Sequence, residues 1–179
     1  MLPRIRADGY IYYITSVLHT RLPIFTKPSF IIPLLDSFNY YRFQYDFKLL
    51  GYVIMPDHFH ILIHPQGQAE TVSDAMRDFK RFTSGRITRQ AKMERKLDWV
   101  AAFEIAGDET SRAEYKVWQD SFWETAIWSE KFLREKLNYI HLNPVRAGLV
   151  ENPQDYPYSS FRNYELNDET LIEIDKDWQ

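Results

Sequence analysis

The chain has 179 residues, of which 45% are hydrophobic and 16% aromatic, enough to build one buried core and too many for a disordered protein. It contains no cysteine, which excludes disulfide bonds and thiolate metal sites. No stretch approaches the roughly 20 apolar residues of a membrane span, and the N-terminus lacks a secretory signal. We therefore expect a cytoplasmic protein with no membrane partner.

The net charge of −3 is unusual for a protein that binds nucleic acid, but the charge is unevenly distributed. Residues 77–96 carry eight basic and two acidic side chains, whereas residues 163–179 carry six acidic side chains and one basic. The basic stretch predicts contacts with phosphate groups, although a solvated helix face explains any single residue equally well. The acidic segment should repel a nucleic acid unless it folds aside.

The first third of the chain predicts a strand, a helix and a hairpin. Residues 10–18 are rich in aromatic and β-branched side chains, which favour a strand. After three prolines, apolar side chains at helical spacing predict a helix over residues 34–49. Residues 52–55 and 58–64 predict two short strands, because Pro56-Asp57 between them suits the centre of a tight turn.

The remainder of the chain predicts two long helices and a last strand. Residues 71–96 have a helical pattern, residues 97–115 predict only a short strand or helix, and residues 117–127 are apolar enough to complete the sheet. Ser129 is a good N-cap for a final helix, which should end near Asn143 because Pro144 disfavours the helical conformation before it.

This order predicts an α+β fold with a ferredoxin-like βαββαβ core. In such a core an antiparallel sheet carries helices on one face, and here a C-terminal helix follows. We expect residues 1–164 to form a single domain and residues 165–179 to form an acidic C-terminal tail.

His58 and His60 form the first candidate site. Side chains alternate along a strand, so both imidazoles point to one face, with Cα atoms about 6 to 7 Å apart. Two neutral nitrogens at this spacing can bind a divalent cation and leave positions for phosphate oxygens and water. On the spacing alone, a polar sheet face near a turn is an equally good interpretation. His64 shares the face but lies about 13 Å from His60, so we do not expect it to bind the same ion.

Tyr139 and Asn143 form the second candidate site. They are four residues apart, which places a phenol and an amide on one helix face, while a buried stripe consists of Leu133, Leu137 and Ile140. A phenol needs a nearby cation to attack phosphate, and a site metal or Lys136 can supply it. The Asn143 amide is a candidate third metal ligand. Because the chain has twelve tyrosines, this pair alone does not establish a nucleophile.

Longer strings around these residues are more specific than the pairs themselves. They are GYVIMPDHFHILIHP at residues 51–65, YIHLNPVRAGLV at residues 139–150 and DYPYSSFRNY at residues 155–164. With them, the chain resembles the REP-associated tyrosine transposases, a branch of the HUH superfamily of single-tyrosine transposases. The resemblance spans nearly the whole chain and leaves out the stretch around residues 97–115 and the residues after Tyr164.

The resemblance implies a role for each candidate residue. His58 and His60 match paired histidines that hold Mg²⁺ or Mn²⁺, Tyr139 matches the nucleophile, and Asn143 matches a polar ligand one turn later. Many superfamily members carry glutamine at this last position, and asparagine is shorter by one methylene. The implied transposase cleaves and rejoins single-stranded DNA hairpins through a 5′-phosphotyrosine intermediate, as a monomer or a homodimer.

A hairpin substrate also implies basic contacts to DNA, for which the candidates are Arg77, Lys80, Arg81, Arg86, Arg89, Lys136 and Arg146. Arg146 can equally cap the end of its helix. Two other functions stay open. One is a metal-dependent nuclease in which water attacks in place of Tyr139, and the other is a protein that binds DNA or RNA hairpins without chemistry.

Overall fold

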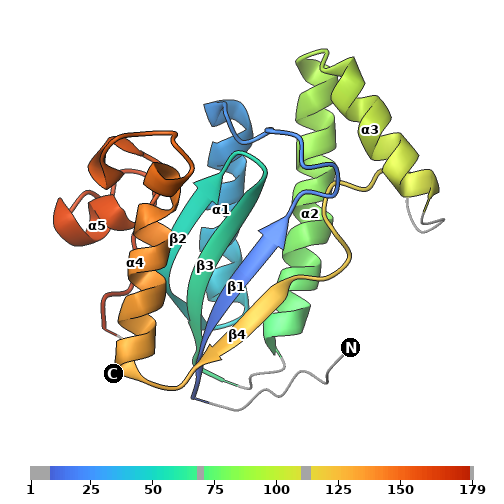
Figure 1. Cartoon of the computed structure of the whole chain (residues 1–179). Helices are drawn as coiled ribbons and strands as arrows, with labels where there is room; N and C mark the ends of the chain where they lie inside the picture. Colours follow the sequence, from blue (N-terminus) through green and yellow to red (C-terminus); the bar gives the residue numbers. More distant parts are fainter. Residues whose placement is uncertain (1–8, 68–70, 110–113, 178–179) are drawn as a thin grey trace.

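A four-stranded antiparallel sheet forms the centre of the fold in the computed structural model, which describes residues 9–67, 71–109 and 114–177 (Figure 1). Its strand order is β2-β3-β1-β4. The strands are β1 (Ile11–Val17), β2 (Phe47–Met55), β3 (His58–Pro65) and β4 (Trp123–Ile127). The last two residues of the predicted acidic tail and the first eight residues of the chain lie outside the described part.

The helices lie on both faces of this sheet. One face is covered by α1 (Pro28–Gln44) and α2 (Thr71–Met93), with α3 (Leu97–Asp108) packed beside α2 (Figure 1). On the opposite face, α4 (Glu130–Arg146) crosses in front of β2 and leaves most of β1 and β4 uncovered (Figure 1). The short helices η1 (Pro153–Asp155) and α5 (Phe161–Glu165) follow α4. The predicted βαββαβ core with α1 and α2 on one face is confirmed.

Two apolar layers hold the sheet between the helices. In the first, Phe38 of α1 lies with its ring centroid 5.0 Å from Phe59 and 4.9 Å from Phe79. The second is smaller and packs Leu62 of β3 against the stripe of α4 made by Leu133, Leu137 and Ile140. The alternation of β3 thus sends Phe59 to one layer and Leu62 to the other, which leaves the two histidines on the α4 side.

The predicted helix over residues 34–49 is displaced toward the N-terminus. It begins at Pro28, where a missing N–H costs nothing, and ends at Gln44. Asp46 then takes a left-handed conformation with φ 48°, and Phe47 starts β2 opposite Pro65. Residues 47–49 therefore pair with β3 as part of a strand, although their apolar spacing favoured a helix.

Other boundaries also differ from the prediction. Residues 97–108 form a regular helix, and the last strand is confined to Trp123–Ile127. The Ser129 cap is confirmed, since its hydroxyl accepts a hydrogen bond from the Phe132 amide at 3.2 Å. However, α4 continues through Pro144 to Arg146. A proline in the last turn removes only its own N–H, and the residues after it can still form helical hydrogen bonds. The Ala147 amide, for example, donates to the Asn143 carbonyl at 3.0 Å.

The acidic C-terminal segment folds along the outer edge of β2. Ile172 and Ile174 are buried in the larger core layer. The amide of Asp175 donates to the Leu49 carbonyl at 2.8 Å, and its carboxylate accepts from the Leu49 amide at 2.8 Å. Salt bridges join Arg42 to Asp175 and Lys48 to Asp177. Two of the acids are thus neutralised against the body of the protein, at the opposite sheet edge from β4. Among the described helices, none has the length and apolar character to cross a membrane.

Candidate active site

His58 and His60 lie side by side on the sheet face that α4 partly covers. Their ring centroids are 4.9 Å apart and the ring planes meet at 78°. In the register of β1 and β3, His60 is opposite Thr15 and His58 is opposite Val17. Strand alternation therefore places the two imidazoles together, as the sequence predicted.

His60 is held by two hydroxyl groups of β1. Its Nδ1 lies 2.6 Å from Thr15 Oγ1 and 2.7 Å from the hydroxyl oxygen of Tyr13. Its Nε2 is buried and has no hydrogen-bond partner among the described residues. Burial, with a smaller electrostatic effect of the neighbouring His58 and Lys136, lowers the pKa of His60 to about 3, so the ring is neutral near pH 7. The ring is therefore neutral, its Nδ1 is held by hydrogen bonds, and its Nε2 is unpartnered, which suits it to bind a metal ion through Nε2.

His58 is oriented by the residue before it. Its Nδ1 lies 2.6 Å from Asp57 Oδ1, and Arg21 donates to Asp57 Oδ2 at 3.1 Å. Burial raises the pKa of Asp57, but the hydrogen bonds from His58 and Arg21 outweigh it and hold that pKa below its usual value. An ionised carboxylate accepts from Nδ1–H, which leaves the Nε2 lone pair available to a metal.

Tyr139 of α4 lies directly beside this pair. Its ring centroid is 5.6 Å from that of His60 and 6.2 Å from that of Tyr13, both in edge-on geometry. The side chain is 40% exposed, so it is neither buried in the interior nor detached from the sheet. The structure therefore brings a phenol from the last long helix to the imidazoles of the hairpin strand.

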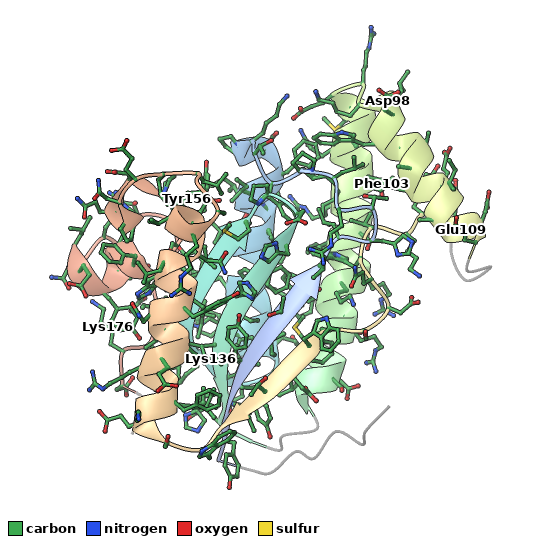
Figure 2. The ribbon with its side chains drawn as sticks, viewed as in Figure 1. Asp98, Phe103, Glu109, Lys136, Tyr156 and Lys176 are labelled. Atoms are coloured by element: carbon green, nitrogen blue, oxygen red, sulfur yellow. The ribbon has the colours of Figure 1, made fainter. Side chains whose placement is uncertain are left out.

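Two cations border the Tyr139 ring. Lys136 Nζ lies 4.6 Å from the Tyr13 ring centroid and 5.9 Å from that of Tyr139, and Figure 2 places this lysine on α4 next to the sheet. The guanidinium carbon of Arg146 lies 5.4 Å from the Tyr139 centroid. Positive charge here favours a bound phosphate. Asn143 follows on the same helix face as Tyr139 and is half-buried.

The protein side chains at this site can supply only some of the ligands that a divalent cation needs. In residues 9–67, 71–109 and 114–177, no three His, Cys, Asp or Glu side chains are grouped to hold a metal. A cation at His58 and His60 would thus take its other ligands from the Asn143 amide, from water or from phosphate oxygens. Such an open coordination sphere suits chemistry on a phosphodiester.

The basic residues predicted on α2 do not join this site. They lie on the helix that covers the other face of the sheet, and they are Arg77, Lys80, Arg81, Arg86 and Arg89 (Figure 1). Charge spacing along a helix shows which residues share a helix face, but it does not show which face of the sheet the helix covers.

Several of these α2 cations already have protein partners. Arg77 forms ion pairs with Asp74 and Asp78, and Arg81 lies 3.4 Å from Asp78. The Lys80 ammonium donates to main-chain carbonyls of residues 119–121 and so holds in place the loop that precedes β4. Arg89 lines a surface cavity of about 650 Å³ together with Lys92. Contacts of these residues with DNA stay a prediction for a surface distant from Tyr139.

Sequence reasoning missed the residues that hold the histidines in place. Asp57 was interpreted only as a turn residue, although a carboxylate next to a candidate metal ligand is itself a signal. Tyr13 and Thr15 alternate on the first predicted strand, but the sequence does not give the register that sets them against His60.

Comparison with known proteins places this chain in a family. Residues 7–107, more than half of the chain, match the family described as Transposase IS200 like. The chain belongs to the IS200-like transposase family. The match ends before α4, so family membership does not by itself assign Tyr139.

Individual IS200-like relatives extend the similarity. A Haemophilus influenzae protein described as a REP-associated tyrosine transposase is 27% identical over 156 residues, which cover 86% of this chain and 80% of the relative. The REP-associated tyrosine transposase of Escherichia coli K12 is 44% identical over 45 residues, 25% of this chain and 27% of that protein. The solved structure of a REP-associated tyrosine transposase bound to a REP hairpin has a TM-score of 0.65 at 22% identity, and the alignment covers 99% of this chain and 93% of that one. At that identity the likeness establishes the fold.

Proposed function

We propose that this transposase cleaves and rejoins single-stranded DNA at hairpins through a covalent bond to Tyr139. The observation that carries the proposal is the 5.6 Å separation of the Tyr139 and His60 rings, beside an unpartnered His60 Nε2. A hairpin as the substrate is supported by the related structure, which holds a REP hairpin.

The proposed reaction is a transesterification. The Tyr139 oxygen attacks the scissile phosphorus in line, the bond from phosphorus to the 3′-oxygen breaks, and the DNA stays attached as a 5′-phosphotyrosine. The departing 3′-oxygen gains a proton to balance the one lost by the phenol. A second 3′-hydroxyl reverses these steps and joins new ends, so no nucleotide cofactor is required.

Each neighbouring side chain has a part in this proposal. His58 and His60 would hold Mg²⁺ or Mn²⁺, with Asn143 as a further ligand, and a cation there supplies charge stabilisation to the phosphate. Asp57, Thr15 and Tyr13 orient the two imidazoles. Lys136 and Arg146 attract the phosphate to the Tyr139 oxygen. Because the proposed substrate is chromosomal DNA, we place the activity in the cytoplasm, carried out by a monomer or a homodimer.

A covalent adduct tests the proposal directly. The protein is incubated with single-stranded hairpin DNA from the neighbourhood of its own gene and Mn²⁺, and a denaturant-resistant complex is sought and mapped by mass spectrometry. We expect the adduct on Tyr139 and its loss in Tyr139→Phe. Tyr40→Phe is the matched control, because Tyr40 is an exposed tyrosine on α1 at the other face.

The alternatives give different results. Cleavage that persists in Tyr139→Phe without an adduct would show that water is the nucleophile. Binding of the hairpin with neither cleavage nor adduct, under any divalent metal, would show a protein that recognises hairpins without chemistry.

A further inference from the structure

The sheet face that carries the histidines also carries one exposed tryptophan, and a second exposed tryptophan lies between the sheet and α4. Trp123 of β4 is 71% exposed, and Trp128, just after β4, is 69% exposed. In the strand register, Trp123 pairs with Thr15 and Thr15 pairs with His60, so these three residues form one row across the sheet. Two strand spacings place Trp123 about 10 Å from His60. Its strand, β4, lies on the part of the sheet that α4 leaves mostly uncovered (Figure 1).

A second row runs from Trp128 along α4 to the proposed nucleophile. The rings of Trp128 and Phe132 have centroids 4.5 Å apart, and Lys136 Nζ lies 5.3 Å from the Phe132 ring and 5.9 Å from the Tyr139 ring. Positions 132, 136 and 139 follow the helical period, so these side chains form one stripe on α4, and Trp128, which precedes the helix, extends it through its contact with Phe132. From Phe132 to Tyr139 the stripe extends about 10 Å, at 1.5 Å per residue.

The composition of this surface indicates its ligand. Scattered exposed aromatic residues are ordinary, but here rings alternate with a cation and lead to the site. The core of a protein-protein interface is usually depleted of charge, whereas surfaces for unpaired nucleic acid combine rings that stack on bases with cations that contact phosphates. Lys136 and Arg146 supply this charge at the Tyr139 end of the stripe.

We propose that Trp123, Trp128 and Phe132 form a stacking surface for the unpaired nucleotides that flank the scissile phosphate. The rings stack on the bases whatever their sequence, and Lys136 contacts a phosphate of the DNA backbone between Phe132 and Tyr139. The location next to the reacting phosphate rests on the function proposed above. The contact with single strands does not depend on cleavage and is tested without it.

The test measures binding in EDTA, where no metal-dependent chemistry takes place. Fluorescence anisotropy compares the full chain with Trp123→Ala, Trp128→Ala and both combined, on labelled oligothymidine of about twelve nucleotides and on a blunt duplex of similar length. Phe43→Ala is the matched control, because Phe43 is 74% exposed, has Arg42 at 5.4 Å from its ring, and lies on α1 at the far face. Trp123→Phe and Trp128→Phe keep an aromatic ring at each position.

We expect each alanine variant to lose about 5-fold or more in affinity for the single strand, with little change on the duplex. The phenylalanine variants and Phe43→Ala should stay near the wild-type value. Unchanged single-strand binding in the double variant would overturn the proposal and leave the rings as a surface for a protein partner. An equal loss on single strand and duplex would also overturn it. If only the proposed catalytic function is wrong, the Tyr139 adduct is absent while the stacking effect remains.

Discussion

The Tyr139 ring stands edge-on to the His60 imidazole, with centroids 5.6 Å apart and planes at 72°. This contact joins α4 to β3, two elements separated by more than 60 residues of chain. The position of α4 is fixed on its other side, where His141 Nε2 lies 3.0 Å from the Ser160 hydroxyl and that hydroxyl accepts from the Tyr52 amide of β2 at 3.0 Å. Ser160 therefore links α4 to β2 and, with the apolar stripe of the helix, holds the phenol next to the imidazoles.

Thr15 should control the affinity of the proposed metal site. Thr15→Val keeps the shape of the side chain but removes the hydroxyl that lies 2.6 Å from His60 Nδ1. Partners of this kind typically contribute 10- to 100-fold to metal affinity, and since Tyr13 remains, we expect a loss of about 10-fold. The measurement is the cleavage rate as a function of Mn²⁺ concentration. Thr88→Val, which removes a buried hydroxyl without a described partner, should leave that curve unchanged. A wild-type curve for Thr15→Val would contradict the assignment.

Asp57 should act through the orientation of His58. Asp57→Asn removes the negative charge that favours a proton on His58 Nδ1, so we expect the metal affinity to fall about 10- to 100-fold. Isothermal titration with Mn²⁺ measures this without DNA. Arg21→Gln removes the other partner of Asp57 and keeps the carboxylate, so it should have a much smaller effect. If the two variants weaken binding equally, the ion pair with Arg21 is what matters.

Local periodicity predicted the histidine pair and the tyrosine–asparagine pair of the candidate site, but it did not predict that the two pairs are in contact. Alternation along β3 placed His58 and His60 on one face, and the helical period placed Tyr139 and Asn143 on one face. The contact between the halves depends on the crossing of α4 over the β2 side of the sheet, which is a property of the tertiary packing. The register that sets Thr15 against His60 is likewise fixed only by the assembled sheet.

The misplaced helix boundary has the same origin. The position of the basic residues of α2 is also a property of the packing, since α2 packs Phe79 against the face opposite the histidines, and their contact with DNA stays a prediction. Residues 47–49 fit the apolar period of a helix, but pairing with β3 and the left-handed Asp46 make them a strand. Propensity describes a segment in isolation, and neighbouring elements override it where they offer hydrogen bonds or burial.

The acidic C-terminal segment should stabilise the fold. Ile174 is 4% exposed and packs in the larger core, so we expect Ile174→Ala to lower the free energy of unfolding by about 2 to 4 kcal/mol. Leu171, three residues earlier and 37% exposed, provides the control, and Leu171→Ala should change it by less than about 0.5 kcal/mol. Urea denaturation followed by circular dichroism measures both. Equal, small effects would mean that residues after Tyr164 are a detachable tail.

Glu94 should make the stability depend on pH in the acid range, because it joins the end of α2 to the start of α1. Its carboxylate accepts from the Ser29 hydroxyl at 2.5 Å, from Gln90 at 2.9 Å and from Lys27 at 3.1 Å. These hydrogen bonds, that of Ser29 first, lower the pKa of Glu94 to about 2 from its ordinary value of 4.5.

A lowered carboxyl pKa means that the folded state binds the proton less readily than the unfolded chain. The contribution of Glu94 is therefore complete above pH 4.5 and is lost as the pH falls toward about 2. We expect Glu94→Gln to melt below the wild type near neutral pH, and this difference should shrink to nothing across that acid interval. Glu135→Gln, which removes one charge from the exposed side of α4, should track the wild type. Thermal melts at a series of pH values measure the difference, and a gap between wild type and Glu94→Gln that stays constant down to about pH 2 would show that the carboxylate contributes nothing through its ionised form.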